Sequence, residues 1–257
     1  MAQNQLMTHL VANFPNPEIY KQALEAMFQN NVDYLEIQLP FSHPVADGPT
    51  IHQANQVALQ FENNLDQIIQ EAVSTKKRFN TKTNLILMSY LTPLVYFGLA
   101  EVCRLLSENG FIGLIVPDLT FFTPEHTEVL GLCKKLELQL IPVISPITTQ
   151  VRINKIKPFV SQDQIIYATA RVGQTGKQTI LDKDEILDRL KFLKRNFTNN
   201  KIVIGFGIRE KGQVDLLNSK GFIAVIGSEI VRIIDSAANE NKDVKQKITE
   251  FISNLSN

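Results

Sequence analysis

The amino-acid sequence predicts an α/β fold, a single-domain (β/α)8 TIM barrel that spans residues 1–257. Short apolar segments typical of buried strands alternate along the whole chain with amphipathic segments typical of helices. No change of composition and no long linker divides the 257 residues, and this length suits one such barrel. Eight expected strands, each followed by a helix, fit this barrel better than a doubly wound sheet. No Gly-x-Gly-x-x-Gly motif follows the first expected strand, which weakens a dinucleotide-binding interpretation.

Eight strands are expected where β-branched, aromatic and other apolar residues cluster between turn-forming residues. They are Met7–Val11, Asp33–Leu39, Asn84–Met88, Gly113–Val116, Gln139–Val143, Gln164–Ala168, Ile202–Gly205 and Ile223–Ile226. Because these segments are mostly apolar, both faces of the sheet should be covered.

Helices are expected where apolar residues recur at spacings of three and four, which places them on one face. The segments are Glu18–Gln29, Leu65–Lys76, Leu99–Glu108, Glu125–Leu136, Val151–Phe159, Asp184–Phe197, Gln213–Ser219 and Val244–Leu255. Each follows an expected strand, as a barrel requires.

The composition excludes several classes of protein. A hydrophobic fraction of 44% and a charged fraction of 20% are those of a soluble globular chain, and a net charge of +0 argues against a nucleic-acid or anionic-membrane surface. The first ten residues lack the pattern of a signal peptide and no stretch reaches about 18 apolar residues, so a cytoplasmic protein is expected. Cys103 and Cys133 are too few for a disulfide framework or a zinc site and are expected to be packing residues.

Two carboxylates mark the stretch from Tyr34 to Asn55. Glu36 lies inside an apolar strand, where an unpaired charge is costly, and Asp47 lies in the turn-rich loop that leaves this strand. A buried acid that can hold its proton, beside a more solvated carboxylate, suggests proton chemistry. The alternative is ordinary: a solvent-facing strand glutamate and an Asp-Gly-Pro turn.

Glycines follow the last two expected strands. Gly205-Phe206-Gly207-Ile208 follows the seventh, and Gly227-Ser228 opens a short apolar helix after the eighth. Barrel active sites lie at the C-terminal ends of the strands, and phosphate commonly binds the loops after strands seven and eight. Backbone N–H groups at glycines and at a helix N-terminus favour an anion, so a phosphate-bearing ligand is expected. A single Gly-x-Gly is also typical of a tight turn.

The segment after the sixth expected strand, residues 167–177, is long, polar and contains two glycines. It predicts a lid with the glycines as hinges, in which Arg171 and Thr175 reach a closed site. The alternative is a disordered connector. Tyr167, within the strand, is either a catalytic group or a core residue.

Several motifs occur in an order typical of one family. They are Pro40-Phe41-Ser42, Ala46-Asp47-Gly48-Pro49-Thr50-Ile51 with Asn55, Pro117-Asp118-Leu119, Gly173-x-Thr175-Gly176, Gly205-Phe206-Gly207-Ile208 and Gly227-Ser228. Together with Glu36 they extend over nearly the whole chain. On these residues the chain resembles the tryptophan synthase alpha subunit, and the first two motifs are highly specific.

The resemblance implies retro-aldol cleavage of indole-3-glycerol phosphate to indole and glyceraldehyde 3-phosphate in L-tryptophan biosynthesis. It places the family's catalytic glutamate, aspartate and tyrosine at Glu36, Asp47 and Tyr167. It places the phosphate-binding residues at Gly176, Gly207, Gly227 and Ser228. It also matches Thr175 to the lid threonine that meets the aspartate when the loop closes.

The resemblance implies a partner, the tryptophan synthase beta subunit, in an α2β2 heterotetramer. The reaction needs proton transfers alone, so no metal and no organic cofactor is expected. A metal site at His43, Asp47 and His52 is disfavoured, because their spacing matches no standard zinc pattern. We assign no role to His9 or His126.

Five residues depart from the family pattern. His43 stands where an acidic residue is usual, Gln38 replaces a common glycine, Thr92 replaces an asparagine, and Thr120-Phe121 interrupts a proline-acidic pattern. We expect these residues around the barrel mouth and the loops that face the beta subunit in the family. They should therefore affect partner affinity more than chemistry.

Two other classes of function remain open. One is a different phosphate-binding barrel enzyme, such as a sugar-phosphate isomerase or aldolase. A Schiff-base aldolase needs a lysine near a strand end, and Lys157, Lys177 and Lys201 lie elsewhere or in loops. The other is a non-catalytic regulator that keeps only the scaffold, which would not require Glu36 and Asp47.

Overall fold

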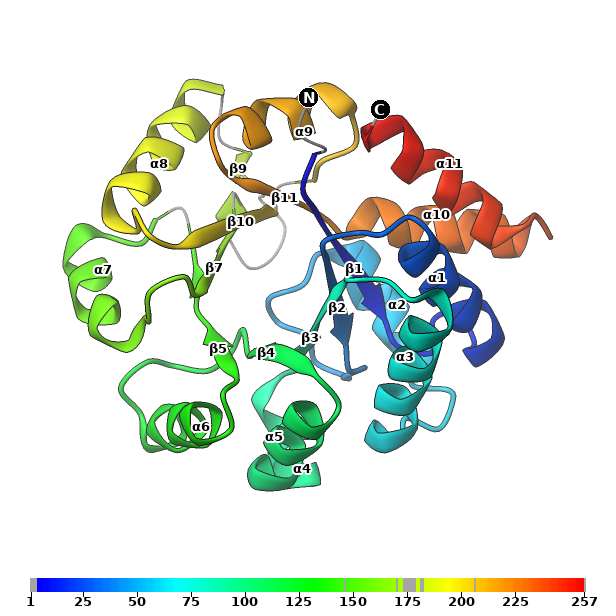
Figure 1. Ribbon diagram of the computed structural model, residues 1–257, viewed down its shortest axis with the longest axis horizontal. Coiled ribbons are helices and arrows are strands. Elements are labelled where there is room, and N and C mark those ends of the chain that lie inside the picture. Colours follow the sequence, from blue (N-terminus) through cyan, green and yellow to red (C-terminus); the bar gives the residue numbers. More distant parts are fainter. Residues whose placement is uncertain are drawn as a thin grey trace.

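A closed ring of parallel strands forms the centre of the protein. The computed structural model describes residues 4–145, 147–169, 171–172, 179–180, 183–205 and 207–256. Nine strand segments form one sheet in the order β5-β4-β3-β2-β1-β11-β10-β7-β6. Because β5 and β6 are consecutive parts of one strand, the nine segments make eight barrel strands, with helices around them (Figure 1).

The barrel segments are β1 (Leu6–Val11), β2 (Tyr34–Gln38), β3 (Asn84–Met88), β4 (Phe111–Ile115), β5 (Gln139–Ile141), β6 (Val143–Ile144), β7 (Ile165–Thr169), β10 (Lys201–Gly205) and β11 (Ile223–Ile226). A separate antiparallel pair is formed by β8 (Arg171–Val172) and β9 (Thr179–Ile180). The barrel confirms the predicted fold class, and each barrel strand begins and ends within two residues of its predicted range.

Pro142 divides the fifth barrel strand into β5 and β6. Proline has no N–H for the ladder, so the strand is interrupted there. The Pro142 carbonyl oxygen still accepts a hydrogen bond from the Tyr167 backbone N–H at 3.0 Å. The ring therefore stays closed between the fifth and sixth barrel strands.

The helices surround the sheet, and several begin with a cap that the sequence supplies. Asn16, Asn64 and Thr123 each accept a hydrogen bond from a first-turn N–H of the helix that follows. The helices are α1 (Pro17–Gln29), α2 (Pro49–Ala58), α3 (Leu65–Phe79), α4 (Leu91–Phe97), α5 (Leu99–Glu108), α6 (Pro124–Lys135), α7 (Gln150–Ile156), η1 (Lys157–Phe159), α8 (Lys183–Asn196), α9 (Lys211–Ser219), α10 (Ser228–Asn239) and α11 (Val244–Ser256).

Two hydrophobic layers follow from the alternation of side chains along the strands. The larger layer lies between the strands and the helices and contains Leu35 and Ile37 of β2. The smaller layer fills the barrel interior and contains Met7, Tyr34 and Val225. A strand residue that shares the inner face with these side chains therefore points into the barrel.

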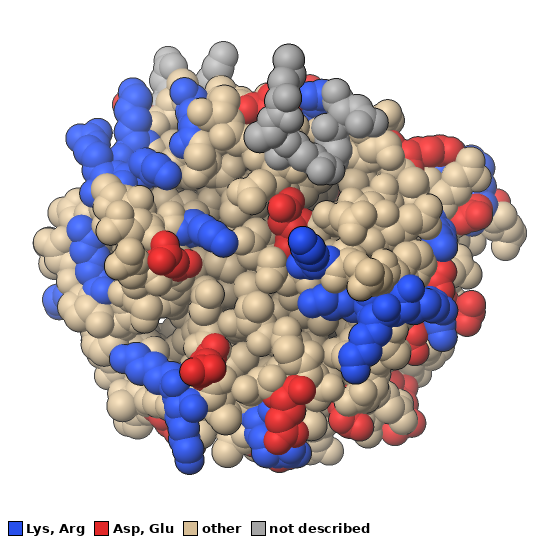
Figure 2. Space-filling view, viewed as in Figure 1, with Lys and Arg blue, Asp and Glu red and all other residues tan. Residues whose placement is uncertain are grey.

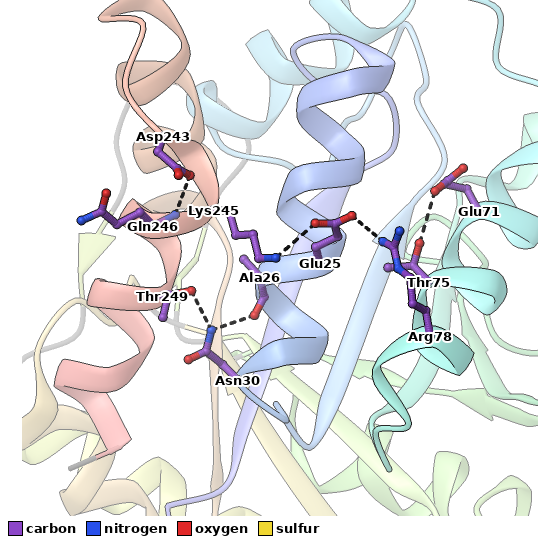
Figure 3. A network of polar contacts seen from close by, with 10 residues as sticks. All are labelled: Glu25, Ala26, Asn30, Glu71, Thr75, Arg78, Asp243, Lys245, Gln246 and Thr249. Atoms are coloured by element: carbon purple, nitrogen blue, oxygen red, sulfur yellow. Dashed lines mark hydrogen bonds and ion pairs between the residues drawn. The ribbon is translucent and has the colours of Figure 1, made fainter.

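A charged network joins α1, α3 and α11 on the outside of the barrel (Figure 3). Glu25 of α1 pairs with Arg78 of α3 and with Lys245 of α11, the latter at 3.2 Å. Burial alone would raise the pKa of Glu25, but Lys245 and Arg78 outweigh it and lower that pKa. The Asn30 amide adds a hydrogen bond of 3.0 Å to Thr249. The last helix is thereby fixed to the first.

The surface carries both signs of charge, scattered over the face that Figure 2 shows with uncharged area between them. Among the described helices, none is both long and apolar enough to cross a membrane. Cys103 on α5 and Cys133 on α6 are free and buried, as expected for packing residues.

Candidate active site

Glu36 points into the barrel from the middle of β2. Its neighbour Leu35 belongs to the outer layer, whereas Tyr34 belongs to the inner one, so Glu36 shares the inner face with Tyr34. The side chain is 3% exposed. The strand register sets it beside His9 of β1 and Ile86 of β3. The expected buried acid is present, and the alternative of a solvent-facing glutamate is wrong.

His9 is the nearest charged or titratable partner that the structure records for Glu36. Its Nδ1 lies 3.4 Å from Oε2 of Glu36, which is an ion-pair contact rather than a short hydrogen bond. Burial alone would lower the pKa of His9, but Glu36, Asp47 and Gln38 together raise it above 6.5. No role was expected for His9 from the sequence, and its contact with Glu36 is a feature that the structure adds.

Asp47 lies in the β2–α2 loop at the C-terminal end of the barrel strands. Its Oδ2 accepts a hydrogen bond of 2.7 Å from Nε2 of Gln38, and the Tyr90 hydroxyl is a second partner. Burial raises the pKa of Asp47 above 3.8, and the charge of Glu36 raises it further, while Gln38, His9 and Tyr90 act in the opposite direction. Asp47 is half-buried and therefore more exposed than Glu36, as expected, and its anion depends on these donors.

Asn55 and Gln38 fix the loop that carries Asp47. The Asn55 side-chain oxygen accepts from the Phe41 backbone N–H at 2.9 Å, and its amide donates to the Ile51 carbonyl at 2.8 Å. Gln38 is 0% exposed and lies inside the barrel. Gln38 therefore lies at the mouth end of the barrel, as expected, but its full burial leaves it no surface that could face a partner.

Tyr167 packs against the inner layer, as the core alternative predicts, and its hydroxyl group is also near the carboxylates. A Cβ added to Gly205 would lie 3.0 Å from the Tyr167 hydroxyl oxygen. Burial raises the pKa of Tyr167 well above 10.0, and the charges of Glu36 and Asp47 raise it further. The phenol is therefore neutral and close enough to the two carboxylates to sense their charge.

The glycine loops also lie at this end of the barrel. Gly207 has a φ of 75°, a left-handed conformation that favours glycine. Gly227 precedes α10, whose first residue is Ser228, and no side chain caps that helix end. A Cβ added to Gly227 would lie 3.4 Å from Cβ of His9, so this loop is adjacent to the inner cluster.

The remaining predicted site residues lie in or near the proposed lid. Arg171 belongs to β8, whose backbone pairs with β9. Its side chain, Thr175 and Gly176 lie outside the described residues.

Five buried side-chain atoms in the described part of the chain lack a hydrogen-bond partner, and three of them belong to this cluster. They are Nε2 of His9, Oε2 of Glu36 and Oε1 of Gln38. Unpaired buried polar atoms are costly and need an explanation, and a ligand in the barrel mouth would supply one.

The described residues contain no group of three or more His, Cys, Asp or Glu that could hold a metal ion.

Comparison with known proteins gives the family of this chain. The family model described as tryptophan synthase alpha chain matches residues 1–257. The tryptophan synthase alpha chain of Aquifex aeolicus is 32% identical over 254 residues, which cover 96% of this chain and 94% of the relative. That of Desulfotalea psychrophila is 33% identical over 231 residues, covering 90% and 87%.

A solved structure agrees with these sequence matches. The tryptophan synthase subunit alpha from Legionella pneumophila str. Paris has a TM-score of 0.84 and 25% identity, over 98% of this chain and 91% of that one. The chain therefore belongs to the tryptophan synthase alpha chain family, lyases that cleave indole-3-glycerol phosphate in tryptophan biosynthesis.

Proposed function

We propose that Glu36, Asp47 and Tyr167 carry out the family's cleavage reaction in this chain. One observation supports this most: two carboxylates from one strand and its loop meet at the C-terminal end of the barrel. Glu36 is buried inside it, and Asp47 is held at 2.7 Å by the Gln38 amide. Catalytic groups of (β/α)8 enzymes occupy this end.

In the proposed reaction Glu36 moves one proton twice. Glu36 first donates a proton to C3 of the indole ring, which leaves the ring positively charged at the N1–C2 bond. The Glu36 carboxylate then removes the proton from the hydroxyl group on the side-chain carbon bonded to C3. The O–H electron pair forms the aldehyde C=O bond, and the electron pair of the broken C–C bond neutralises the ring. Glu36 ends with its proton restored.

Asp47 and Tyr167 act on the indole ring, which becomes positively charged during these steps. The Asp47 anion accepts a hydrogen bond from the indole N–H and so stabilises the cationic ring. The Gln38 amide and the Tyr90 hydroxyl favour that anion, because they donate hydrogen bonds to it. Tyr167 is neutral and partly buried near the carboxylates, where it forms part of the wall against the ring.

The substrate phosphate binds the backbone of Gly207, Gly227 and Ser228 in this proposal. The first N–H groups of α10 have no partner within the helix, and the helix dipole favours an anion at that end. Gly176, Arg171 and Thr175 are assigned to the same phosphate site and its lid. Phosphate held there fixes the reacting carbon near Glu36.

We propose that a tryptophan synthase beta subunit covers the barrel mouth. Exposed large apolar residues lie in the segments after β2, β3, β4 and β6, at the C-terminal ends of the strands. They are Val45, Val95, Tyr96, Phe122 and Ile147, and Tyr96 is 83% exposed. Apolar surface rimmed by polar residues is typical of a protein interface.

A cytoplasmic location, where thiols stay reduced, fits the two free cysteines.

The deciding experiment measures indole release from indole-3-glycerol phosphate, with and without a beta subunit. Glu36→Gln should lower kcat by about a thousandfold or more, because an amide can neither give nor take the proton. It should still bind glyceraldehyde 3-phosphate. Glu71→Gln, on the outer helix α3, is the matched control and should leave kcat unchanged. Activity of Glu36→Gln within tenfold of the parent chain would refute the assignment.

A further inference from the structure

His9 and Glu36 form a buried pair inside the barrel. Neighbouring parallel strands bring them together, because the register of β1 and β2 sets His9 beside Glu36. His9 is 6% exposed and Glu36 is 3% exposed. The 3.4 Å contact joins Nδ1 to Oε2, and that oxygen has no closer hydrogen-bond partner. Both side chains are therefore largely shielded from bulk water.

The charges around His9 come from two elements. Glu36 of β2 and Asp47 of the β2–α2 loop are the charged groups that act on the imidazole in the described part of the chain. On the β11 side, Gly227 offers no side chain and lies against the Cβ of His9. Tyr167 contributes no charge, since its pKa is well above 10.0. Among the described side chains, His9 therefore faces two carboxylates and no cation.

We propose that His9 is a positioning residue for the cleavage reaction, sharing one proton with Glu36 and orienting its carboxyl group toward the substrate. This inference rests on the proposed role of Glu36. When Glu36 gives its proton to C3, the Nδ1 proton of His9 stabilises the carboxylate that remains. When Glu36 takes the hydroxyl proton, the pair returns to its first state. No proton is lost to solvent, and nothing is oxidised or reduced.

The shared proton extends the pH range of activity. Two strongly interacting groups lose their protons in steps that belong to the pair, and the last proton leaves at a higher pH than it would from either group alone. The raised pKa of His9 is consistent with this coupling. The alkaline limb of the kcat profile should therefore reflect loss of the last proton from the His9–Glu36 pair. Its position should depend on an imidazole at position 9.

The test compares kcat from pH 6.5 to 9.5 for the parent chain, His9→Gln and His9→Phe. Both variants should move the alkaline limb to lower pH by about one unit, with about a tenfold loss of kcat at pH 8.5. His9→Gln can still hydrogen-bond Glu36, so its kcat at pH 6.5 should stay within about threefold of the parent. The second ionisation of a phosphate monoester lies near pH 6 and leaves this limb unaffected.

A second measurement does not depend on turnover. Nuclear magnetic resonance of ¹⁵N-labelled histidine in the full-length chain gives the titration midpoint of His9, and Glu36→Gln should lower that midpoint. His126, which is buried on α6 away from this site, is the internal control and should not move. This titration decides the question even if His9→Phe does not fold.

The outcomes separate this inference from the proposed function. If Glu36→Gln keeps its activity, the proposed function fails. If Glu36→Gln is inactive but both His9 variants keep the parent alkaline limb, His9 is only a packing residue and the inference alone fails. An unchanged His9 midpoint in Glu36→Gln would overturn the inference in the same way.

Discussion

Replacement of Gln38 by leucine should weaken catalysis far more than folding. Gln38 donates a 2.7 Å hydrogen bond to Asp47 and is completely buried, while its own Oε1 has no partner. A hydrogen bond to a charged group contributes about 1.5–3 kcal/mol. If loss of this bond raises the transition state by that amount relative to the free enzyme, kcat/KM should fall about ten- to a hundredfold, since each factor of ten corresponds to roughly 1.4 kcal/mol.

The stability of Gln38→Leu should change much less. The variant loses the bond to Asp47 but also removes a buried carbonyl oxygen that has no partner. These two effects oppose each other, so the free energy of unfolding should change by less than about 1 kcal/mol. Urea unfolding of both chains measures it directly.

The pH dependence of kcat/KM should also change in Gln38→Leu. Gln38 lowers the pKa of Asp47 against the raising effects of burial and Glu36. Without it that pKa rises further, so the acid limb of kcat/KM should move to higher pH, because the Asp47 anion is the active form.

The matched control is Gln56→Leu. The Gln56 amide donates to the Ser42 carbonyl at 2.9 Å and ties down the same loop from outside without touching Asp47. It should change kcat/KM by less than about threefold. If Gln38→Leu also keeps kcat/KM within twofold, or if its acid limb does not move, Gln38 does not sustain the Asp47 anion.

Three further predictions concern packing, stability and the partner. Gly205→Ala should lower kcat several-fold, because its Cβ would lie 3.0 Å from the Tyr167 hydroxyl; a Gly131→Ala control has open space, and equal effects would contradict this. Glu25→Gln should lower the free energy of unfolding by about 1 kcal/mol at pH 7, a modest value because its partners are partly exposed. The pKa of Glu25 is lowered on folding, so this difference should vanish as pH falls below 4.5, and a pH-independent difference would refute the ion-pair account. His43→Asp should strengthen binding to a generic beta subunit and weaken binding to the cognate one by several-fold in titrations, and no change in either would make His43 a neutral loop residue.

Much of the fold could be predicted, because strand and helix positions follow from local patterns. The barrel strands are mostly apolar, which distinguishes them from the amphipathic helices. Asn16 and Thr123 stand directly before α1 and α6 in the sequence and cap them. The break in the fifth strand at Pro142 was not predicted, although the missing N–H of proline is a local signal. The short helix α4 (Leu91–Phe97) was also missed, since it has one fully buried apolar side chain and no periodic stripe.

The residues of the candidate site were predicted from the sequence only where a single residue or a contiguous motif marks them. Glu36 in an apolar strand and Asp47 in a turn-rich loop are visible in the sequence, whereas the contacts of His9 and Gln38 depend on strand register. His9 shares the inner face of β1 with Met7, and period-two alternation could have shown this. The predicted barrel already places β1 beside β2, but the contact with Glu36 also required their register, which no local pattern specifies.

Both carboxylates thus have a polar neighbour that projects into the barrel from β1 or β2. His9 accompanies Glu36, and Gln38 accompanies Asp47. A charge inside an apolar barrel is costly unless it is paired or hydrogen-bonded, so each neighbour offsets part of the cost of one carboxylate. Nε2 of His9 and Oε1 of Gln38 have no hydrogen-bond partner among the described residues, and a bound substrate would supply one. The polar interior is therefore better explained by the state with substrate bound than by the stability of the empty barrel.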